Sequence, residues 1–373
     1  MKNIKIFFFF INILISTLIL EIILQLSYKL SAGDYLINRA NLPLYDSDNF
    51  CCWKLKKNID ISHKTSEFSY NIYTNNLSQR IQNKSLNQFE MKDGKTVLFM
   101  GPSFGFGWGV DYEKSYSKLI GDHYLENDFK NIINASVPGH LPSQQLCWYL
   151  QEGFKLNPDV IIHTLTSKLQ LYIPDNINLE NPQFCKELCG NTKVNKKGFL
   201  TTTGSNFITD PKFFLKNSAL IFYSWYSITK IQSYFISNDK IIKSATGLEF
   251  HDLKNYSDIN HEKKYKNYIN LIKNKNNKTK VIFLFIPDSY NIHLSDRARW
   301  SHQNIDFESS LTGYKKNIDK VSKNFNFVDT YPYLTKVSKS KRLYYYVDTH
   351  FNEIGNQITF DIFHEYCKQN NCF

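Results

Sequence analysis

Short apolar runs alternate along most of the chain with stretches whose apolar residues recur at helical spacing. The runs that predict buried strands are Lys95–Met100, Asn131–Ala135, Asp159–Leu165, Lys280–Ile286 and Phe325–Asp329. The stretches that predict helices are Ser115–Asn127, Leu141–Leu156, His261–Asn276, Ser309–Asn324 and Ile354–Lys368. Continuous apolar strands separated by helices are typical of a parallel sheet covered on both faces. We therefore predict an α/β fold: a flavodoxin-like doubly wound parallel sheet in a three-layer α/β/α domain over residues 95–370.

Two regions do not fit this alternation. Residues 29–94 show no clear pattern and form a lead-in region. The interval between the third and fourth predicted strands exceeds one hundred residues and is too long for a plain crossover, so an insertion is expected at about residues 172–260. We expect its aromatic helical stretch, Lys212–Ile236, to pack on the domain. A membrane-apposed lid and a docking segment for a partner protein stay open as alternatives.

The N-terminal residues predict a membrane segment. Residues 6–24 are apolar apart from a few polar positions, among them Glu21, and Lys2 and Lys5 precede them. Positive charge ahead of an apolar segment keeps the N-terminus in the cytoplasm. The segment is just long enough to span a bilayer, which needs about 20 apolar residues. Residues 1–28 are therefore predicted as a single-pass transmembrane helix that leaves the rest of the chain extracytoplasmic, in the periplasm or outside the cell.

A cleaved signal peptide is the alternative to this anchor. Small residues within Leu30–Gly33 offer a cleavage site. We favour the uncleaved anchor, because the apolar pattern is longer than the apolar region of a typical signal peptide. Both interpretations send the bulk of the chain out of the cytoplasm.

Composition and charge narrow the classes of partner. Hydrophobic residues make up 42% of the 373 residues and aromatic residues 16%, which is enough for a sizeable core. The formal net charge of +11 favours attraction to anionic lipid or an acidic polymer. The lysines are scattered, and no basic run interleaved with aromatic residues stands out, so nucleic acid is not predicted as a partner.

Seven cysteines are compatible with an oxidising compartment. Cys185 lies close to Cys189, and Cys367 lies close to Cys372, so local disulfides are feasible. Zinc is the alternative, but these pairs lack the CxxC spacing of common zinc sites. We predict neither a metal ion nor another cofactor.

A predicted buried strand leads directly into a serine and a glycine-rich turn. Residues 97–110 read VLFMGPSFGFGWGV, and Ser103 follows Gly101 and Pro102. At the end of a parallel strand, the next helix presents free N–H groups and the positive end of its dipole. A serine there has an exposed hydroxyl beside backbone donors for an oxyanion. A phosphate loop fits less well, since the glycine spacing is not GxGxxG. A serine that merely caps a helix stays open.

An aspartate and a histidine stand two positions apart near the C-terminus. Asp348 and His350 lie in the segment VDTHFNEIGN, at the entrance to the last predicted helix. At this spacing the carboxylate can reach Nδ1 of the ring, which leaves Nε2 free to take a proton from a serine. A pair that merely caps the helix is the alternative. In a doubly wound sheet, the loops that carry Ser103 and this pair are expected at the same carboxyl edge.

Three segments resemble the blocks of membrane-tethered SGNH/GDSL hydrolases. MGPSFGFGWGVDYEKSY is similar to the first block, INASVPGHLPSQQL to the second and DTHFNEIGN to the last. Weaker similarity at YTNNLSQR and FLFIPDSY extends the resemblance over about residues 70–366. The resemblance implies that Ser103 is the nucleophile, that His350 is the acid/base and that Asp348 orients it. It also implies an oxyanion hole formed by the N–H groups of Ser103 and Gly139.

The sequence departs from this family pattern in two places. Pro102 replaces the aspartate that usually precedes the nucleophile, which changes the turn but not the triad. The third-block asparagine is missing after the strand DVIIHTL, and the loss of one oxyanion donor typically costs about 10²–10³ in rate. The residues there that can act as substitute donors are Ser167, Lys168 and Gln170.

The expected activity is therefore acyl transfer by a serine esterase or O-acyltransferase. The expected substrate is an ester-bearing glycan or lipid of the cell surface, since a tethered enzyme gains most from a substrate at the same surface. The alternative is a catalytically impaired SGNH scaffold that binds glycans or assists assembly. Structural roles are expected for His163 and Ser289, while His140 is placed beside the cleft without an assigned role.

Overall fold

A computed structural model provides the three-dimensional structure of the chain. The residues that it describes are 2–32, 42–65, 67–166, 185, 192–202, 218–221, 223, 224, 227, 261–297, 315, 318–346, 348–370 and 372. Most of the predicted insertion, including most of Lys212–Ile236, lies outside these residues, as does half of the predicted helix Ser309–Asn324.

The central sheet of the described chain is parallel and has the order β12-β11-β8-β6-β7. Its strands are β6 (Lys95–Met100), β7 (Phe129–Asn134), β8 (Val160–Thr166), β11 (Lys280–Ile286) and β12 (Phe327–Asp329). Numbered along the chain, the spatial order is 2-1-3-4-5, which is the flavodoxin-like doubly wound order. The fold-class prediction is confirmed, and every predicted strand overlaps an observed one.

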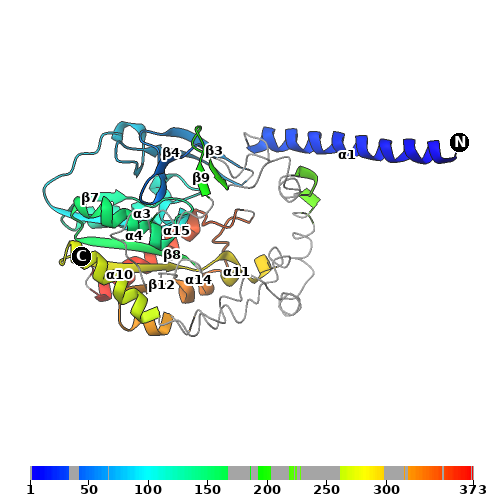
Figure 1. The fold of residues 1–373 in the computed structure, drawn as a ribbon. Coiled ribbons are helices and arrows are strands. Elements are labelled where there is room, and N and C mark those ends of the chain that lie inside the picture. Colours follow the sequence, from blue (N-terminus) through cyan, green and yellow to red (C-terminus); the bar gives the residue numbers. More distant parts are fainter. Residues whose placement is uncertain are drawn as a thin grey trace.

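Helices cover both faces of this sheet, as Figure 1 shows. One face packs against α4 (Pro142–Gln151) and α10 (His261–Lys275), and the other against α3 (Tyr116–Glu126), α14 (Tyr331–Val337) and α15 (Glu353–Asn370). Alternate residues of β6 point to opposite faces of the sheet. Leu98 and Met100 pack in the core under α4 and α10. Val97 and Phe99 pack in the core under α3, α14 and α15. The two cores are continuous and apolar because each strand is buried on both sides.

The predicted helix Leu141–Leu156 is shorter in the structure. The α-helix α4 ends at Gln151, and a separate 3₁₀ turn, η4 (Gly153–Leu156), follows it. At Gly153 an added Cβ would lie 2.7 Å from a ring carbon of Trp148, so the chain turns tightly against its own helix there. A glycine at such a position favours the end of a helix over its continuation.

The lead-in region is folded, although its sequence predicts no regular element. It contains β1 (Tyr45–Asp48), β2 (Cys52–Leu55), β3 (Asp60–Lys64), β4 (Ser69–Thr74) and β5 (Arg80–Ile81), together with the 3₁₀ turn η2 (Lys84–Leu86). The β1–β2 hairpin lies beside a second hairpin, β9 (Thr192–Val194) and β10 (Leu200–Thr202). All of these strands except β3 and β4 have two to four residues, which is too short to leave a clear period in the sequence.

A third apolar core joins the lead-in region to the α/β domain. Trp53, Tyr70 and Ile72 from the lead-in strands pack with Phe106 and Val137, which follow β6 and β7. Both of these domain residues lie at the carboxyl edge of the central sheet. The lead-in region is therefore built against the edge where a doubly wound fold carries its functional site.

The N-terminal helix α1 (Lys2–Ala32) projects beyond the α/β domain (Figure 1). Its segment Lys5–Ser27, 23 residues long, is long and apolar enough to cross a membrane. A signal sequence near an N-terminus has the same properties.

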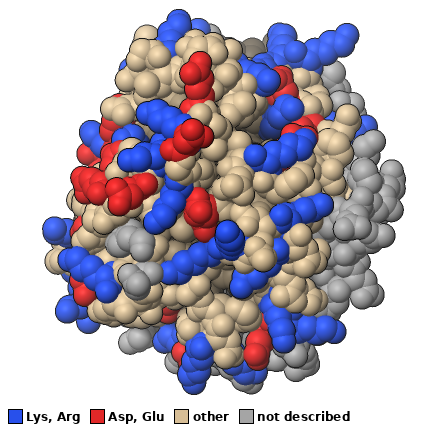
Figure 2. Space-filling view, turned by 90° about the vertical axis from the view of Figure 1, so that its left-hand side faces the viewer, with Lys and Arg blue, Asp and Glu red and all other residues tan. Residues whose placement is uncertain are grey.

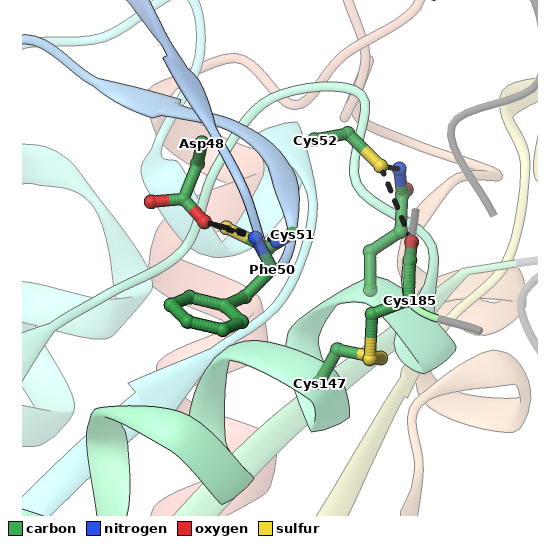
Figure 3. Close-up of a disulfide and its surroundings, with 7 residues drawn as sticks. Asp48, Phe50, Cys51, Cys52, Cys147 and Cys185 are labelled. Carbon is green, nitrogen blue, oxygen red and sulfur yellow. Dashed lines mark hydrogen bonds between the residues drawn. A yellow bond between two sulfur atoms is a disulfide. The ribbon is translucent and has the colours of Figure 1, made fainter. Parts of the chain in front are cut away.

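Two disulfides join pairs of cysteines that both lie among the described residues. Cys367 pairs with Cys372, a local pair of the kind that the spacing allows. Cys185 pairs with Cys147 of α4, across 38 positions, and not with its sequence neighbour (Figure 3). Cys147 lies on the face of α4 that points into the core, so the bond depends on how α4 packs and leaves no sign in cysteine spacing.

The charged side chains are dispersed on the face seen in Figure 2. Lysines and arginines lie between uncharged areas, and acidic residues lie among them. This face carries no single basic stripe of the kind that follows a nucleic-acid backbone.

Candidate active site

Ser103 lies at the point where β6 ends and a short helix begins. The helix α2 (Ser103–Phe106) starts at the serine, and Pro102 before it is extended, with φ −79° and ψ −153°. Gly101 passes so close to β8 that an added Cβ would lie 2.7 Å from Cβ of Thr164. The glycine therefore lets the chain leave the strand beside its neighbour, and Ser103 stays half-buried and open to a substrate.

The structure brings Ser103 together with Asp348 and His350. The Oγ atom of Ser103 lies 2.6 Å from Nε2 of His350, and Nδ1 of the same ring lies 2.5 Å from Oδ1 of Asp348. An ionised carboxylate only accepts hydrogen bonds, so the proton of the neutral ring belongs on Nδ1. Nε2 is then the acceptor of the Ser103 hydroxyl. This is the arrangement that general-base activation of a serine requires.

The environment of Asp348 keeps its carboxyl group ionised. Burial acts to raise the pKa of Asp348, but the charge of His350 and the hydrogen bond from it outweigh burial and lower this pKa. The indole Nε1 of Trp108 also donates to Oδ2 of Asp348, at 3.4 Å. Both carboxylate oxygens thus have donors, which fixes the plane of the group relative to the ring of His350.

Gly139 lies in the loop after β7, the strand next to β6. Its φ is +85°, a conformation that favours glycine, and the residue is exposed. The backbone N–H of Val137 donates to the carbonyl of Gly101 at 2.9 Å, which ties this loop to the residue that precedes Pro102. Within the described part of the chain, the N–H groups of Ser103 and Gly139 donate no hydrogen bond. Their role in an oxyanion hole stays a prediction.

The candidates for a third oxyanion donor, Ser167, Lys168 and Gln170, lie outside the described residues. Strand β8 ends at Thr166, directly before them. A donor at this position stays a prediction.

Three further polar residues considered from the sequence, His140, His163 and Ser289, are buried and, among the described residues, form no hydrogen bond with Ser103, His350 or Asp348. His140 packs against Trp53 and its Nε2 lies 2.8 Å from the Trp53 carbonyl oxygen; burial lowers its pKa to about 4. Nδ1 of His163 lies 2.5 Å from the hydroxyl of Tyr268, and burial lowers its pKa to about 3. Ser289 is buried on α11 (Ser289–Ile292). The expected structural role of His163 is confirmed.

Sequence reasoning gave no role to Arg80, which supports the glycine-rich turn. Its guanidinium is fully buried and donates to the carbonyls of Phe106 (2.6 Å), Gly107 (2.5 Å) and Val110 (2.7 Å). It also lies over the ring of Phe106, 4.5 Å from the centroid. The planar guanidinium of an arginine has several N–H groups that can donate to different carbonyls of one turn, whereas a lysine has a single ammonium group. The weak resemblance of YTNNLSQR to SGNH proteins was the one sequence signal for this residue.

Comparison with known proteins identifies structural neighbours but no sequence family. No family model matches the chain, and no curated protein matches it. The structural neighbours include lipases, acetyl xylan esterases and two proteins described as GDSL or GDSL-like. The lipase Lip_vut3 from a goat rumen metagenome is 12% identical, with 73% of this chain and 97% of that chain covered and a TM-score of 0.39. The acetyl xylan esterase AlAXEase is 16% identical, with 72% and 98% covered and a TM-score of 0.36.

A third neighbour is a lipolytic protein of the G-D-S-L family from Veillonella parvula, 12% identical, with 73% of this chain and 97% of that chain covered and a TM-score of 0.33. Identities of this size show a shared fold alone.

Proposed function

We propose that this chain is a serine esterase of the SGNH type that acts on O-acyl esters, with Ser103 as its nucleophile. The observation that carries the proposal is the continuous hydrogen-bonded series from Ser103 through His350 to Asp348. The series lies at the carboxyl edge of a doubly wound sheet, where such folds bind their ligands.

In the proposed reaction, Nε2 of His350 takes the hydroxyl proton as Oγ of Ser103 attacks the ester carbonyl. The negative charge on the carbonyl oxygen is stabilised by the N–H groups of Ser103 and Gly139. The tetrahedral intermediate collapses, the alcohol leaves with the proton from His350, and an acyl-Ser103 ester remains. Water, deprotonated by His350, then attacks this ester and releases the acid. If a sugar hydroxyl takes the place of water, the same site is an O-acyltransferase.

The proposed substrate is an acyl ester on a cell-surface glycan or lipid. Support comes from the apolar helix α1 and from the net charge of +11, which favours an anionic surface. The disulfides Cys147–Cys185 and Cys367–Cys372 favour an oxidising compartment outside the cytoplasm.

We further propose that α1 is retained as a single-pass anchor. Glu21, inside the apolar segment, accepts hydrogen bonds from the hydroxyl of Ser218 (2.8 Å) and the backbone N–H groups of Ala219 (2.7 Å) and Leu220 (2.9 Å). An ionisable residue in a membrane segment needs such partners, because an unpaired charge in hydrocarbon is costly. If α1 were cleaved off as a signal peptide, these contacts with residues nearly 200 positions away would be lost from the mature protein.

The full-length protein, tagged at both ends, should stay in the membrane pellet after alkaline carbonate extraction and carry both tags. A soluble species that keeps the C-terminal tag and lacks the N-terminal tag would show that α1 is removed.

The activity is tested by labelling the full-length protein in membranes with a fluorophosphonate probe, which reacts with activated serines. The wild type should be labelled, and Ser103→Ala and His350→Ala should not, because one lacks the nucleophile and the other its base. An unlabelled wild type that is folded would overturn the esterase proposal. It would favour the alternative, a catalytically impaired scaffold for glycan binding or assembly, which the proline at 102 and the missing third-block asparagine motivate.

A further inference from the structure

A carboxylate of the lead-in region binds the backbone of the Asp348–His350 loop. Glu67 lies between β3 and β4, and its Oε1 accepts a hydrogen bond from the N–H of Tyr346 at 2.6 Å. Its Oε2 accepts a second from the N–H of Asp348 at 2.8 Å. Glu67 thus holds two N–H groups that are two positions apart in one turn. Hydrogen bonds to an ionised acceptor are stronger than neutral ones, and two of them from one carboxylate fix an orientation as well as a distance.

The loop held by Glu67 contains a strained residue. Thr349, between Asp348 and His350, has φ +71°. A β-branched residue rarely adopts this conformation, which persists only where surrounding contacts impose it. Thr349 links the two residues, so its backbone conformation bears on how the Asp348 carboxylate meets the ring of His350. Any contact that holds this turn therefore bears on the 2.5 Å hydrogen bond between the two side chains.

Contacts hold the loop on both sides of Thr349. On the histidine side, the carbonyl of His350 accepts from the N–H of Tyr345 at 2.8 Å, and the Tyr345 hydroxyl donates to the carbonyl of Gly109 at 2.9 Å. On the aspartate side, Glu67 supplies the acceptor for the backbone N–H of Asp348. The indole of Trp108 reaches the Asp348 side chain, but it does not contact that backbone group through any hydrogen bond described for the chain.

We propose that Glu67 is a positioning residue for catalysis, which acts by holding the backbone of Asp348. The inference rests on the proposed esterase function. Glu67 touches none of the reacting atoms, so its effect must pass through Asp348. It also gives the lead-in region a function: these residues complete the site instead of merely joining the anchor to the domain.

The experiment compares Glu67→Gln with wild type in the full-length protein in detergent, with p-nitrophenyl acetate as substrate. A glutamine keeps the size of the side chain, but its NH₂ group faces one of the two N–H donors and cannot accept from it. We expect kcat to fall about 10- to 100-fold with KM within about twofold, because a small misplacement of a catalytic group has an effect of this size. The exposed Glu90, in the same region, supplies the control Glu90→Gln, which should match wild type.

A double-mutant cycle separates positioning from general loss of structure. The readout is the rate of fluorophosphonate labelling of Ser103, which can be followed for hours in slow variants. In an Asp348→Asn background, Glu67→Gln should lower this rate by less than about threefold, because residues that act as one unit are non-additive. A full 10- to 100-fold loss in that background would overturn the inference. If Glu67→Gln does not fold, Glu67→Asp, which keeps the charge with a shorter reach, replaces it with the same expectations.

The outcomes for the two proposals are distinct. Labelling that survives Ser103→Ala would overturn the proposed function itself. Labelling that depends on Ser103, together with a Glu67→Gln variant as active as wild type, would overturn the role of Glu67 and leave the esterase proposal intact.

Discussion

Replacing Ser103 or His350 by alanine is expected to lower kcat for ester hydrolysis about 10⁴- to 10⁶-fold. Ser103 supplies the attacking oxygen, and the 2.6 Å contact with Nε2 of His350 supplies the base that activates it. Because the serine and the histidine act as one unit, the Ser103→Ala/His350→Ala double variant should be about as slow as either single variant. Asp348→Asn should cost about 10⁴-fold, since an amide favours the wrong tautomer of the ring.

The measurement is p-nitrophenyl acetate hydrolysis by the full-length protein in detergent. Ser289→Ala is the matched control: Ser289 also follows a central strand, but it is buried on α11 and has no contact with His350 among the described residues. This control should keep kcat within about twofold of wild type. Ester hydrolysis by Ser103→Ala at more than about a tenth of the wild-type rate would be incompatible with the proposed nucleophile.

Lowering the pH from 7.5 to 5.0 is expected to reduce the free energy of unfolding, by about 4 kcal/mol through His140 and His163 alone. Burial lowers the pKa of His140 to about 4 and that of His163 to about 3, so both stay neutral in the folded chain at pH 5. In the unfolded chain each has an ordinary pKa of about 6.5 and takes up a proton, which favours unfolding. Each histidine contributes about 2 kcal/mol at pH 5. Burial also lowers the pKa of His293 to about 4, and its effect has the same sign.

The sign of this effect defines the pH window. The stability linked to these histidines is fully present above about pH 6.5 and falls as the pH decreases toward 4. Urea unfolding of the full-length protein in detergent, followed by tryptophan fluorescence, measures it at each pH. His140→Asn should reduce the slope of stability against pH by about one proton, whatever its effect on absolute stability. Equal stability at pH 7.5 and 5.0 would contradict the burial of neutral histidines.

The lead-in region supports the two turns that carry the site residues. Arg80 holds the turn that follows Ser103, and Glu67 holds the turn that contains Asp348. Arg80 lies on β5 and Glu67 lies in the turn between β3 and β4, so both belong to the lead-in region. A chain shortened to the α/β domain alone would lack both contacts.

The sequence by itself determined the parts of this protein that depend on neighbouring residues. Continuous apolar runs such as 280–286 predict buried strands because every residue of such a strand is covered. The spacing of Asp348 and His350 predicts their contact because two residues in one loop cannot lie far apart. The catalytic roles of these residues, and that of Gly139, stay proposals.

Only the tertiary structure decided the contacts between distant segments. The Glu67 and Asp348 positions are 281 residues apart, and those of Cys147 and Cys185 are separated by 38. A contact of this kind needs one correctly placed pair and leaves no period in either segment. The lead-in strands were missed for a related reason: a strand of four residues is too short to show a pattern, and its stability comes from packing on Phe106 and Val137. The sequence therefore predicts pairs such as Asp348 and His350, which lie in one loop. The contacts that hold such a loop in place, such as that of Glu67, are decided by the fold.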